Sequence, residues 1–350
     1  MKILFFIDKL YGGGAERVAT ILMNHLCEKN NVSVFIFNDS KAPYPMDDRI
    51  NIQKITIKNK CKLSRFLKRI KNINEGIKKN SPDLIISFLT PTNIYVLTAN
   101  LFLRKKIIIS ERNTLNRIQS RIVRLIRKIL YPLADKIVFV TKADNIKFGL
   151  PQKSITIYNP TIFEPFTDYN HRENSIITIA PINRWYNKGL DLLIKAWGLI
   201  SRQNPNWNLE ILGNNDDCPI PNDFKKQERI VWLGWKNNVC ETLRTKNIFV
   251  LASRYEGCPN SLIEAMSQGC ACLGTNCEGG INEIITDGTS GLLVRNGNVN
   301  DLATKLQLLI DNKQLRKKLS AGAIEEIKRF NKENIMKQWD KLIEMVTQVK

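Results

Sequence analysis

The sequence predicts an α/β protein built from two doubly wound parallel sheets, and two observations lead to this fold class. Short, wholly apolar runs alternate with amphipathic stretches along the chain. Such runs, separated by helices, are typical of parallel strands that helices cover on both faces. The chain also has 350 residues, which exceeds one ordinary core and suits two domains of about 150 residues each.

The expected strands fall into two sets. The first set is Ile3–Ile7, Val32–Phe37, Leu84–Phe88, Ile107–Ser110 and Ile137–Val140. The alternation of apolar runs and amphipathic stretches stops at Asn159-Pro160 and in the polar stretch that reaches Asn174. It then begins again with Ile176–Ala180, Leu209–Leu212, Ile230–Leu233, Ile248–Leu251 and Ala271–Gly274.

This interruption divides the chain into three parts. We expect an N-terminal Rossmann-like domain over residues 1–165, a C-terminal one over residues 166–330, and a last helix over residues 331–350. The last helix should pack back on the first domain. Because ligands of doubly wound sheets bind at the carboxyl ends of the strands, we expect the domains to face each other across a cleft there.

Composition argues against membrane-spanning and metal-binding classes. No apolar run approaches the roughly 18 residues of a membrane span, and Ile3–Ile7 is too short for the apolar part of a signal peptide. Eight cysteines without a C-x-x-C pair, and only two histidines, favour reduced thiols over a zinc site or a disulfide framework. We therefore expect a cytoplasmic protein without a bound metal.

Positive charge is concentrated in the first half. The whole chain has a formal net charge of +20, of which residues 1–165 contribute +17 and residues 166–350 only +3. This imbalance predicts that the first half faces an anionic partner, such as nucleic acid, a phospholipid surface or a phosphorylated acceptor. A solvated lysine-rich surface is the alternative, but the concentration in one half argues against it.

Two glutamates form the most informative motif. Glu256 and Glu264 stand eight residues apart in R-Y-E-G-C-P-N-S-L-I-E-A-M, between an apolar run and a helical pattern. A carboxylate before a helix and another in its first turn can bracket a polyhydroxylated ligand, while the loop amides and the helix dipole face a phosphate. Ser261-Leu-Ile-Glu264 is also a capping box, so Glu264 could instead satisfy the helix N-terminus.

Two loops that follow strands carry further candidates. Gly12-Gly-Gly-Ala-Glu-Arg17 opens a helix, where glycines allow close approach of a ligand to the backbone, although a plain tight turn has the same pattern. It is not G-x-G-x-x-G, so a dinucleotide site is not indicated. Arg184 and Lys188 follow the strand Ile176–Ala180 and could neutralise a leaving diphosphate, unless they are only a solvated basic loop. The sequence has no Asp-x-Asp pair to hold a metal on such a diphosphate, which favours protein cations in place of Mg²⁺.

Several stretches together form a specific set: G-G-A-E-R (13–17), R-W-Y-N-K-G (184–189), L-G-W (233–235), E-G-C-P-N-S-L-I-E-A (256–265) and G-G-I-N-E-I-I with G-T-S-G-L-L-V (279–294). By these motifs the chain resembles, over nearly its whole length, the retaining glycosyltransferases of the GT-B fold, and among them family 4. S-F-L-T-P-T-N (87–93), I-S-E-R-N (109–113) and Y-P-L-A-D (131–135) resemble bacterial enzymes that extend undecaprenyl-diphosphate-linked oligosaccharides.

The resemblance implies roles on the donor side. Arg184 and Lys188 would hold the donor diphosphate, Glu264 would bond the ribose hydroxyls, and Glu256 would contact the transferred sugar. Backbone near Gly234 and Trp235 would read the base. The diphosphate would also meet backbone from the first domain at Gly13 and Gly14, and loop amides at Gly257, Cys258, Asn260, Ser261 and Leu262.

On the acceptor side the resemblance implies Glu16, Glu111 and Arg112. Relatives often have histidine where this chain has Arg112, and an arginine cannot act as a general base. In retaining transfer the departing phosphate itself can accept the proton of the acceptor, so catalysis would rest on electrostatic stabilisation of the transition state.

A basic amphipathic segment, residues 117–130, accounts for part of the first domain's charge. At 100° per residue one face collects Arg117, Arg121, Arg124, Arg127 and Lys128. The other face collects Ile118, Ile122, Leu125, Ile126 and Ile129. Such a helix can lie in a membrane interface or present arginines to a lipid diphosphate. Alternatively, its apolar face packs on its own domain.

The sequence therefore predicts a metal-independent, retaining transferase. It would move a hexose or N-acetylhexosamine from a nucleotide sugar to a lipid-diphosphate-linked saccharide on the cytoplasmic face of the inner membrane. The resemblance favours a UDP-sugar as the donor. The product would be a surface polysaccharide such as O-antigen or capsule. The alternative is a basic nucleotide- or nucleic-acid-binding protein without transferase activity, although the sequence has no RNP motif, zinc module or interleaved aromatics to support a nucleic-acid partner.

Overall fold

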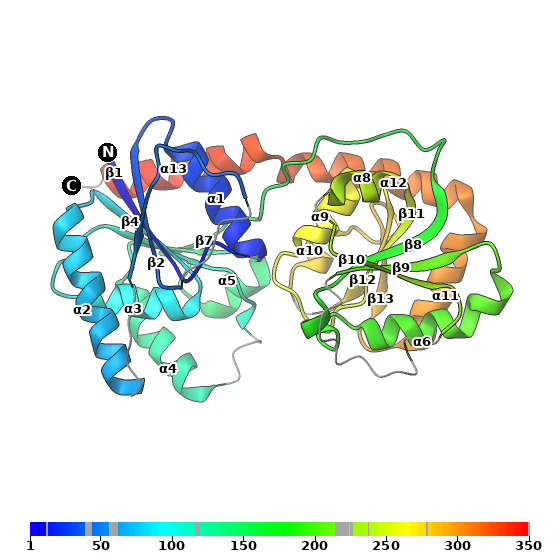
Figure 1. Ribbon diagram of the computed structural model, residues 1–350, viewed down its shortest axis with the longest axis horizontal. Helices are drawn as coiled ribbons and strands as arrows, with labels where there is room; N and C mark the ends of the chain where they lie inside the picture. Colours follow the sequence, from blue (N-terminus) through cyan, green and yellow to red (C-terminus); the bar gives the residue numbers. More distant parts are fainter. Residues whose placement is uncertain are drawn as a thin grey trace. The chain divides into compact units, whose positions relative to one another are not determined.

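The computed structural model describes the chain except residues 12, 39–43, 56–61, 116–119, 214–223, 225–226, 237, 278 and 349–350. The chain divides into two compact units (Figure 1). Unit 1 comprises Met1–Asn159 and Glu333–Lys350, and unit 2 comprises Pro160–Lys332. The division falls a few residues before the expected boundary at residue 165.

Unit 1 is built on a parallel sheet of seven strands in the order β3-β2-β1-β4-β5-β6-β7. The strands are β1 (Lys2–Ile7), β2 (Asn31–Ile36), β3 (Asn51–Lys54), β4 (Leu84–Phe88), β5 (Ile107–Glu111), β6 (Lys136–Phe139) and β7 (Ser154–Thr156). The five strands expected in this half are confirmed. The sequence did not reveal β3 and β7, which are short and partly polar.

Helices cover both faces of this sheet. They are α1 (Gly14–Leu26), α2 (Lys62–Asn80), α3 (Thr90–Asn100), α4 (Arg121–Leu130), η2 (Tyr131–Leu133), α5 (Lys142–Phe148) and α13 (Lys332–Gln348). Successive side chains of a strand point to opposite faces. Accordingly, Phe5 of β1 packs with α1 and α13, whereas its neighbour Phe6 packs with α2 and α3.

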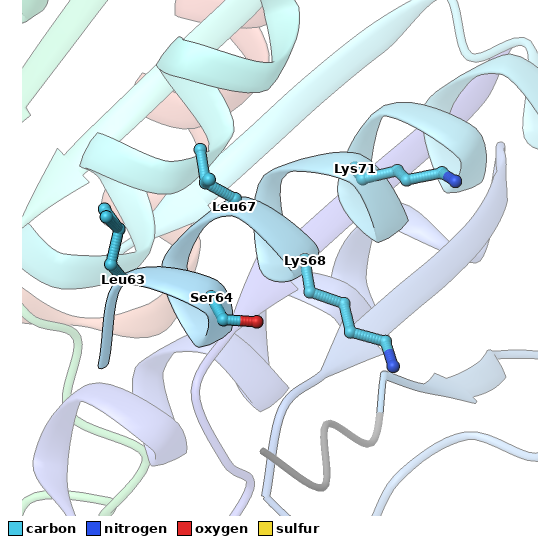
Figure 2. Close-up of a pocket in the computed structure, with 5 residues that line it drawn as sticks. All are labelled: Leu63, Ser64, Leu67, Lys68 and Lys71. Atoms are coloured by element: carbon cyan, nitrogen blue, oxygen red, sulfur yellow. The ribbon is translucent and has the colours of Figure 1, made fainter. Parts of the chain in front are cut away.

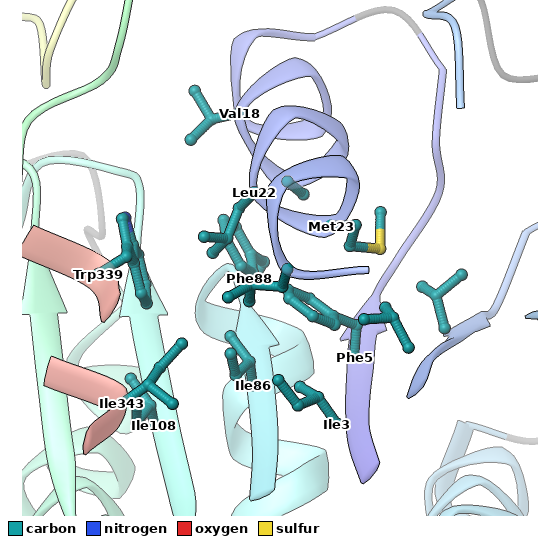
Figure 3. Close-up of a cluster of buried hydrophobic side chains, with 14 of the residues drawn as sticks. Ile3, Phe5, Val18, Leu22, Met23, Ile86, Phe88, Ile108, Trp339 and Ile343 are labelled. Carbon is teal, nitrogen blue, oxygen red and sulfur yellow. The ribbon is translucent and has the colours of Figure 1, made fainter. Parts of the chain in front are cut away.

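The last helix, α13, belongs to the core of unit 1, as expected. Trp339 is fully buried, and its ring lies 6.3 Å from that of Phe88, which in turn lies 6.3 Å from Phe5 (Figure 3). Aromatic pairs at this spacing stabilise a core beyond their buried area. The C-terminal helix is therefore tied to strands that lie at the beginning of the chain.

Unit 2 has a parallel sheet of six strands in the order β10-β9-β8-β11-β12-β13. The strands are β8 (Glu173–Ile179), β9 (Asn208–Leu212), β10 (Ile230–Gly234), β11 (Lys246–Leu251), β12 (Ala271–Asn276) and β13 (Leu292–Arg295). Its helices are η3 (Ile182–Arg184), α6 (Leu190–Ile200), η4 (Ser201–Gln203), α8 (Val239–Arg244), α9 (Asn260–Ser267), α10 (Ile281–Ile284), α11 (Val299–Asp311), α12 (Lys313–Ile327) and η5 (Lys328–Phe330).

Both strand orders reverse direction at one point. The chain of unit 1 runs outward from β1 to β3 and then returns to β4 on the other side of β1, and unit 2 repeats this between β8 and β11. Loops diverge at such a switch point and leave a crevice beyond the carboxyl ends of the two strands. The topology thus places the loop after β8 beside the loop after β11.

In the described ranges of the chain, no helix is long and apolar enough to cross a bilayer.

Candidate functional site

The loops that follow β8 and β11 lie against each other. Gly189 ends the first loop with φ of 62°, in the left-handed region, and a Cβ there would lie 1.9 Å from the carbonyl oxygen of Ala252 in the second. Both the backbone angle and the space require glycine at this position. The close approach fixes the neighbours of Gly189 and Ala252 relative to each other.

This packing brings Lys188 and Glu256 together. Lys188 Nζ donates to Glu256 Oε1 over 2.5 Å, and Ser253 Oγ donates to the same oxygen over 2.7 Å. The side chains of Lys188 and Glu256 are only 17% and 14% exposed, so water screens their attraction less than on an open surface. Two residues assigned from the sequence to the donor thus form one charged pair.

Arg184 lies in the same loop but differs in its surroundings. It ends the short helix η3, and its carbonyl accepts the amide of Lys188 over 2.9 Å. Its side chain is exposed. The loop therefore presents one cation held by a carboxylate and a second cation facing solvent.

Two glycines hold the Glu256 loop from its other side. Glu256 pairs with Gly279 as a parallel bridge, and Gly280 N donates to Gly257 O over 2.8 Å. A Cβ would lie 1.7 Å from Glu256 O at Gly279, where φ is 122°, and 2.0 Å from Gly257 O at Gly280. The motif G-G-I-N-E-I-I implied no role for this glycine pair, and its close packing against the Glu256 loop supplies one.

The helix α9 carries the second glutamate. It begins at Asn260 and has Pro259 at its N-cap, so Ser261 is not the capping residue. The interpretation of Ser261–Glu264 as a capping box is therefore wrong, because a capping box needs the serine at the N-cap. Glu264 is buried in the body of the helix.

The loop residues before and within α9 differ in what they offer a phosphate. Cys258 and Leu262 are buried, whereas Gly257, Asn260 and Ser261 are half-buried. The amide of Leu262 donates to Pro259 O over 3.1 Å and is thus engaged inside the helix. The contact predicted between the Leu262 amide and a phosphate is therefore not favoured.

Gly234 and Trp235 lie at the end of β10. Gly234 has φ of 65° and follows an irregularity in the pairing of β10 with β9, and its carbonyl accepts the amide of Gly213. The side chain of Trp235 is exposed. Because all six strands are parallel, this turn lies at the same edge of the sheet as Lys188 and Glu256.

In unit 1, Gly13 and Gly14 stand where α1 begins. Gly13 is the N-cap and Gly14 the first helical residue. A Cβ on Gly13 would lie 2.1 Å from a carboxylate oxygen of Glu16, which is itself buried. Glu16 therefore folds back over the start of its own helix, where a negative charge is stabilised by the helix dipole. The acceptor contact that the resemblance implies for Glu16 stays a prediction.

Glu111 is fully buried at the end of β5 and has internal partners. Thr90 Oγ1 and Tyr131 OH donate to Glu111 Oε2 over 2.6 and 2.7 Å, and Arg127 Nη2 lies 3.7 Å from it. Burial, and next the adjacent Glu111, raise the pKa of Tyr131 well above its usual range. The carboxylate of Glu111 has no exposed surface, and the acceptor contact that the resemblance implies for it stays a prediction.

Arg112 also has an internal role. Its guanidinium lies 4.8 Å from the ring centre of Phe88 and 5.8 Å from that of Trp339, and its Nη1 donates to Asn159 Oδ1 over 2.8 Å. The side chain is buried. Arg112 therefore connects β4, α13 and Asn159 within unit 1, and the acceptor role that the resemblance implies for it stays a prediction.

The helix α4 departs from its predicted orientation. Arg127, expected on the exposed cationic face, is buried and stacks on Tyr131 at 5.2 Å. In contrast Ile122, Leu125 and Ile129 are 70%, 59% and 61% exposed, so the alternative that they pack on their own domain is wrong. Arg121 and Arg124 are exposed as expected, and Arg117 lies outside the described residues.

An open pocket of about 540 Å³ lies in unit 1, and none of its described lining residues is a predicted site residue. Its described lining residues all come from α2 and are Leu63, Ser64, Leu67, Lys68 and Lys71 (Figure 2). Leu63 and Leu67 are exposed large apolar side chains, as on α4.

In the described ranges, no group of three or more His, Cys, Asp or Glu residues is placed to hold a metal.

Both halves of the chain match known families. Residues 163–326 match the family described as Glycosyl transferases group 1, and residues 12–161 match Glycosyltransferase Family 4.

Among curated proteins, the chain is 27% identical over 357 residues, 98% of each protein, to a Campylobacter jejuni GalNAc-alpha-(1->4)-GalNAc-alpha-(1->3)-diNAcBac-PP-undecaprenol alpha-1,4-N-acetyl-D-galactosaminyltransferase. It is also 27% identical over 365 residues, 95% of this chain and 97% of the other, to the Campylobacter jejuni N-acetylgalactosamine-N,N'-diacetylbacillosaminyl-diphospho-undecaprenol 4-alpha-N-acetylgalactosaminyltransferase.

Among solved structures, Anabaena Alr3699/HepE in complex with UDP superimposes with a TM-score of 0.80 at 18% identity, covering 99% of this chain and 100% of the other. At that identity the likeness concerns the fold.

Proposed function

We propose that this chain, which belongs to the GT-B glycosyltransferases, transfers a hexose or N-acetylhexosamine from a UDP-sugar to a lipid-diphosphate-linked saccharide in bacterial surface polysaccharide synthesis. Two relatives that align along nearly the whole chain are named for transfer to undecaprenyl-diphosphate-linked sugars. A protein of the same fold was solved with UDP. These names support the acceptor class and the nucleotide.

The observation that carries the proposal is the Lys188–Glu256 pair at the switch point of unit 2. A lysine ammonium has three N–H groups, so Lys188 can keep its bond to Glu256 and donate to a phosphate as well. Glu256 then lies between the phosphate and the sugar. Its carboxylate can accept hydrogen bonds from the hydroxyl groups of the sugar. Arg184, exposed in the same loop, can close on the diphosphate as a second cation.

We propose a retaining, metal-independent reaction. The bond between the sugar's anomeric carbon and the UDP oxygen breaks, and a bond from the acceptor hydroxyl oxygen to that carbon forms on the same face. The hydroxyl proton passes to the departing phosphate. Lys188 and Arg184 stabilise the charge that develops on UDP, which is the largest contribution that fixed groups can make to such a reaction.

We further propose that α4 brings unit 1 to an anionic membrane surface, where the acceptor lipid resides. Ile122, Leu125 and Ile129 form an exposed apolar ridge, and Arg121 and Arg124 lie beside it. An apolar ridge flanked by cations binds the interface of a bilayer with anionic lipids. The net charge of unit 1 complements such a surface.

The test is transfer by the full-length protein. A panel of UDP-sugars and GDP-sugars is incubated with the protein and a purified undecaprenyl-diphosphate-linked saccharide, and both nucleotide release and the mass of the lipid product are followed. We expect one UDP-sugar to give a product that is longer by one sugar, with release that depends on the acceptor. Release without a longer product, or no release from any donor, would refute the proposal.

A further inference from the structure

A second ion pair, between Arg254 and Asp191, involves residues close in sequence to Lys188 and Glu256. Arg254 precedes Glu256 by two residues in the loop after β11, and Asp191 follows Lys188 by three residues in the first turn of α6. Arg254 Nη1 and Nη2 donate to the two oxygens of Asp191 over 2.8 and 2.7 Å. This two-bond arrangement fixes the direction of both groups as well as their distance.

Arg254 also binds the loop that carries Lys188. Its Nη1 donates to the carbonyl oxygen of Tyr186, its backbone amide donates to that of Asn187 over 3.0 Å, and its guanidinium lies 3.8 Å from the ring centre of Tyr186. The side chains of Arg254 and Asp191 are 22% and 11% exposed. Hydrogen bonds to Asp191 raise the pKa of Arg254.

The close approach of Gly189 to Ala252 brings the two loops together, and the contacts of Arg254 add directed hydrogen bonds to it. A lysine side chain ends in a point charge on a flexible stem, so a salt bridge alone tolerates many positions of its loop. The hydrogen bond from Ser253 orients Glu256, but it lies within the loop after β11 and does not connect it to the loop of Lys188. Arg254 makes that connection on both sides of Lys188, at residues 186, 187 and 191.

We infer that Asp191 and Arg254 are positioning residues that hold Lys188 and Glu256 in the geometry needed for sugar transfer. The inference rests on the proposed function of that site. Neither residue contacts the donor in this role. Their effect is on the relative placement of two loops, and a misplacement of about 1 Å can lower turnover about 100-fold.

A purely structural role is the alternative. Asp191 lies in the first turn of α6, where a carboxylate stabilises a helix through the helix dipole, typically by about 0.3–1 kcal/mol. In that case, loss of Asp191 would lower the melting temperature and leave turnover per folded molecule unchanged. The positioning role predicts that, in molecules that remain folded, kcat falls and UDP binds more weakly, because Lys188 holds the diphosphate.

The experiment uses the full-length protein, the UDP-sugar that it uses fastest and the lipid-linked acceptor. Asp191→Asn keeps the size of the side chain, and Arg254→Lys keeps the charge but loses the fork. Glu325→Gln is the matched control, because it weakens an exposed ion pair with Lys328 on another part of unit 2. We expect Asp191→Asn and Arg254→Lys to lower kcat about 10- to 100-fold and to weaken UDP binding, but by a smaller factor than Lys188→Ala does. Glu325→Gln should match the wild type.

Coupling gives the sharper result. Once Lys188→Ala has removed the group to be positioned, adding Asp191→Asn should lower kcat less than threefold further. If the two substitutions together lower kcat by the product of their separate effects, the inference is overturned. An Asp191→Asn variant with kcat near that of the wild type would also overturn it. Failure of both variants to fold would assign the pair to stability and overturn it too. If the wild type transfers no sugar, the proposed function itself fails, which is a different outcome.

Discussion

Replacing Gly189 by alanine should force apart the loops that carry Lys188 and Glu256. The new Cβ would lie 1.9 Å from the carbonyl oxygen of Ala252, a distance that a backbone atom can relieve only by moving. Gly288→Ala is the matched control, because Gly288 also has a positive φ, 72°, but no described atom lies within 4 Å of its Cβ position.

The two variants share one cost and differ in another. An alanine in the left-handed region costs roughly 1–2 kcal/mol at either site. Overpacking adds about 1–3 kcal/mol at Gly189 only. For a unit of this size, 1 kcal/mol corresponds to a shift in melting temperature of about 2–4 °C. Gly189→Ala should therefore melt about 2–12 °C below Gly288→Ala.

Calorimetry of the two full-length variants measures this difference, and the transfer assay measures its effect on the site. We expect Gly189→Ala to lose most of its activity at a temperature where it is still folded, because its two loops are displaced. Gly288→Ala should keep its activity. Equal melting temperatures for the two variants, or full activity in Gly189→Ala, would refute the close packing of these loops as the feature that sets the site.

Four further outcomes follow from the same structure. Lys188→Ala should lower turnover by about 10- to 100-fold, as loss of a charged hydrogen bond to phosphate implies, in a transfer assay with unchanged circular dichroism. Arg127→Met should lower the melting temperature by about 6–20 °C, because it leaves a buried carboxylate unpaired, while UDP affinity measured by calorimetry stays the same. Replacing Arg121 and Arg124 together by Glu should release the protein from anionic liposomes, and unchanged co-sedimentation would contradict this. Burial raises the pKa of Cys277 to about 11, so the unfolded thiol ionises first and the urea midpoint should fall as pH rises from 9 towards 11.

The sequence predicted the architecture well because parallel strands buried on both faces leave an unmistakable apolar pattern. The central strands, such as β4 and β11, contain long apolar runs and were placed closely. The edge strand β3 was missed because its residues, Asn51–Lys54, are exposed or half-buried and so lack the apolar run. An edge strand takes its shape from its neighbour, which a single sequence does not display.

The sequence indicated part of the candidate site. Lys188 and Glu256 could be selected as candidates because each follows a buried strand, and the topology brings their loops together. Asp191 and Arg254 were missed, since a helix-start aspartate and a loop arginine are common surface residues and only their pairing distinguishes them. K-G-L-D in the loop after β8, together with R-Y-E-G in the loop after β11, is the signal that could have found them.

The acceptor side shows a different limit. Charge composition alone cannot tell an exposed arginine from one that is buried against a carboxylate. Arg127 lies on the wheel beside the other basic residues, yet it points inward because the partner that receives it, Glu111, comes from β5. That partner lies outside the helix, so the helical pattern carried no sign of it.

Titration of UDP into the full-length protein, in the presence of a chelator, tests most directly whether fixed cations of unit 2 hold the nucleotide. We predict that the wild type binds UDP without added metal and that Lys188→Ala binds it about 10- to 100-fold more weakly. Binding that disappears with the chelator and returns with magnesium or manganese would contradict this, as would equal affinities of the wild type and Lys188→Ala.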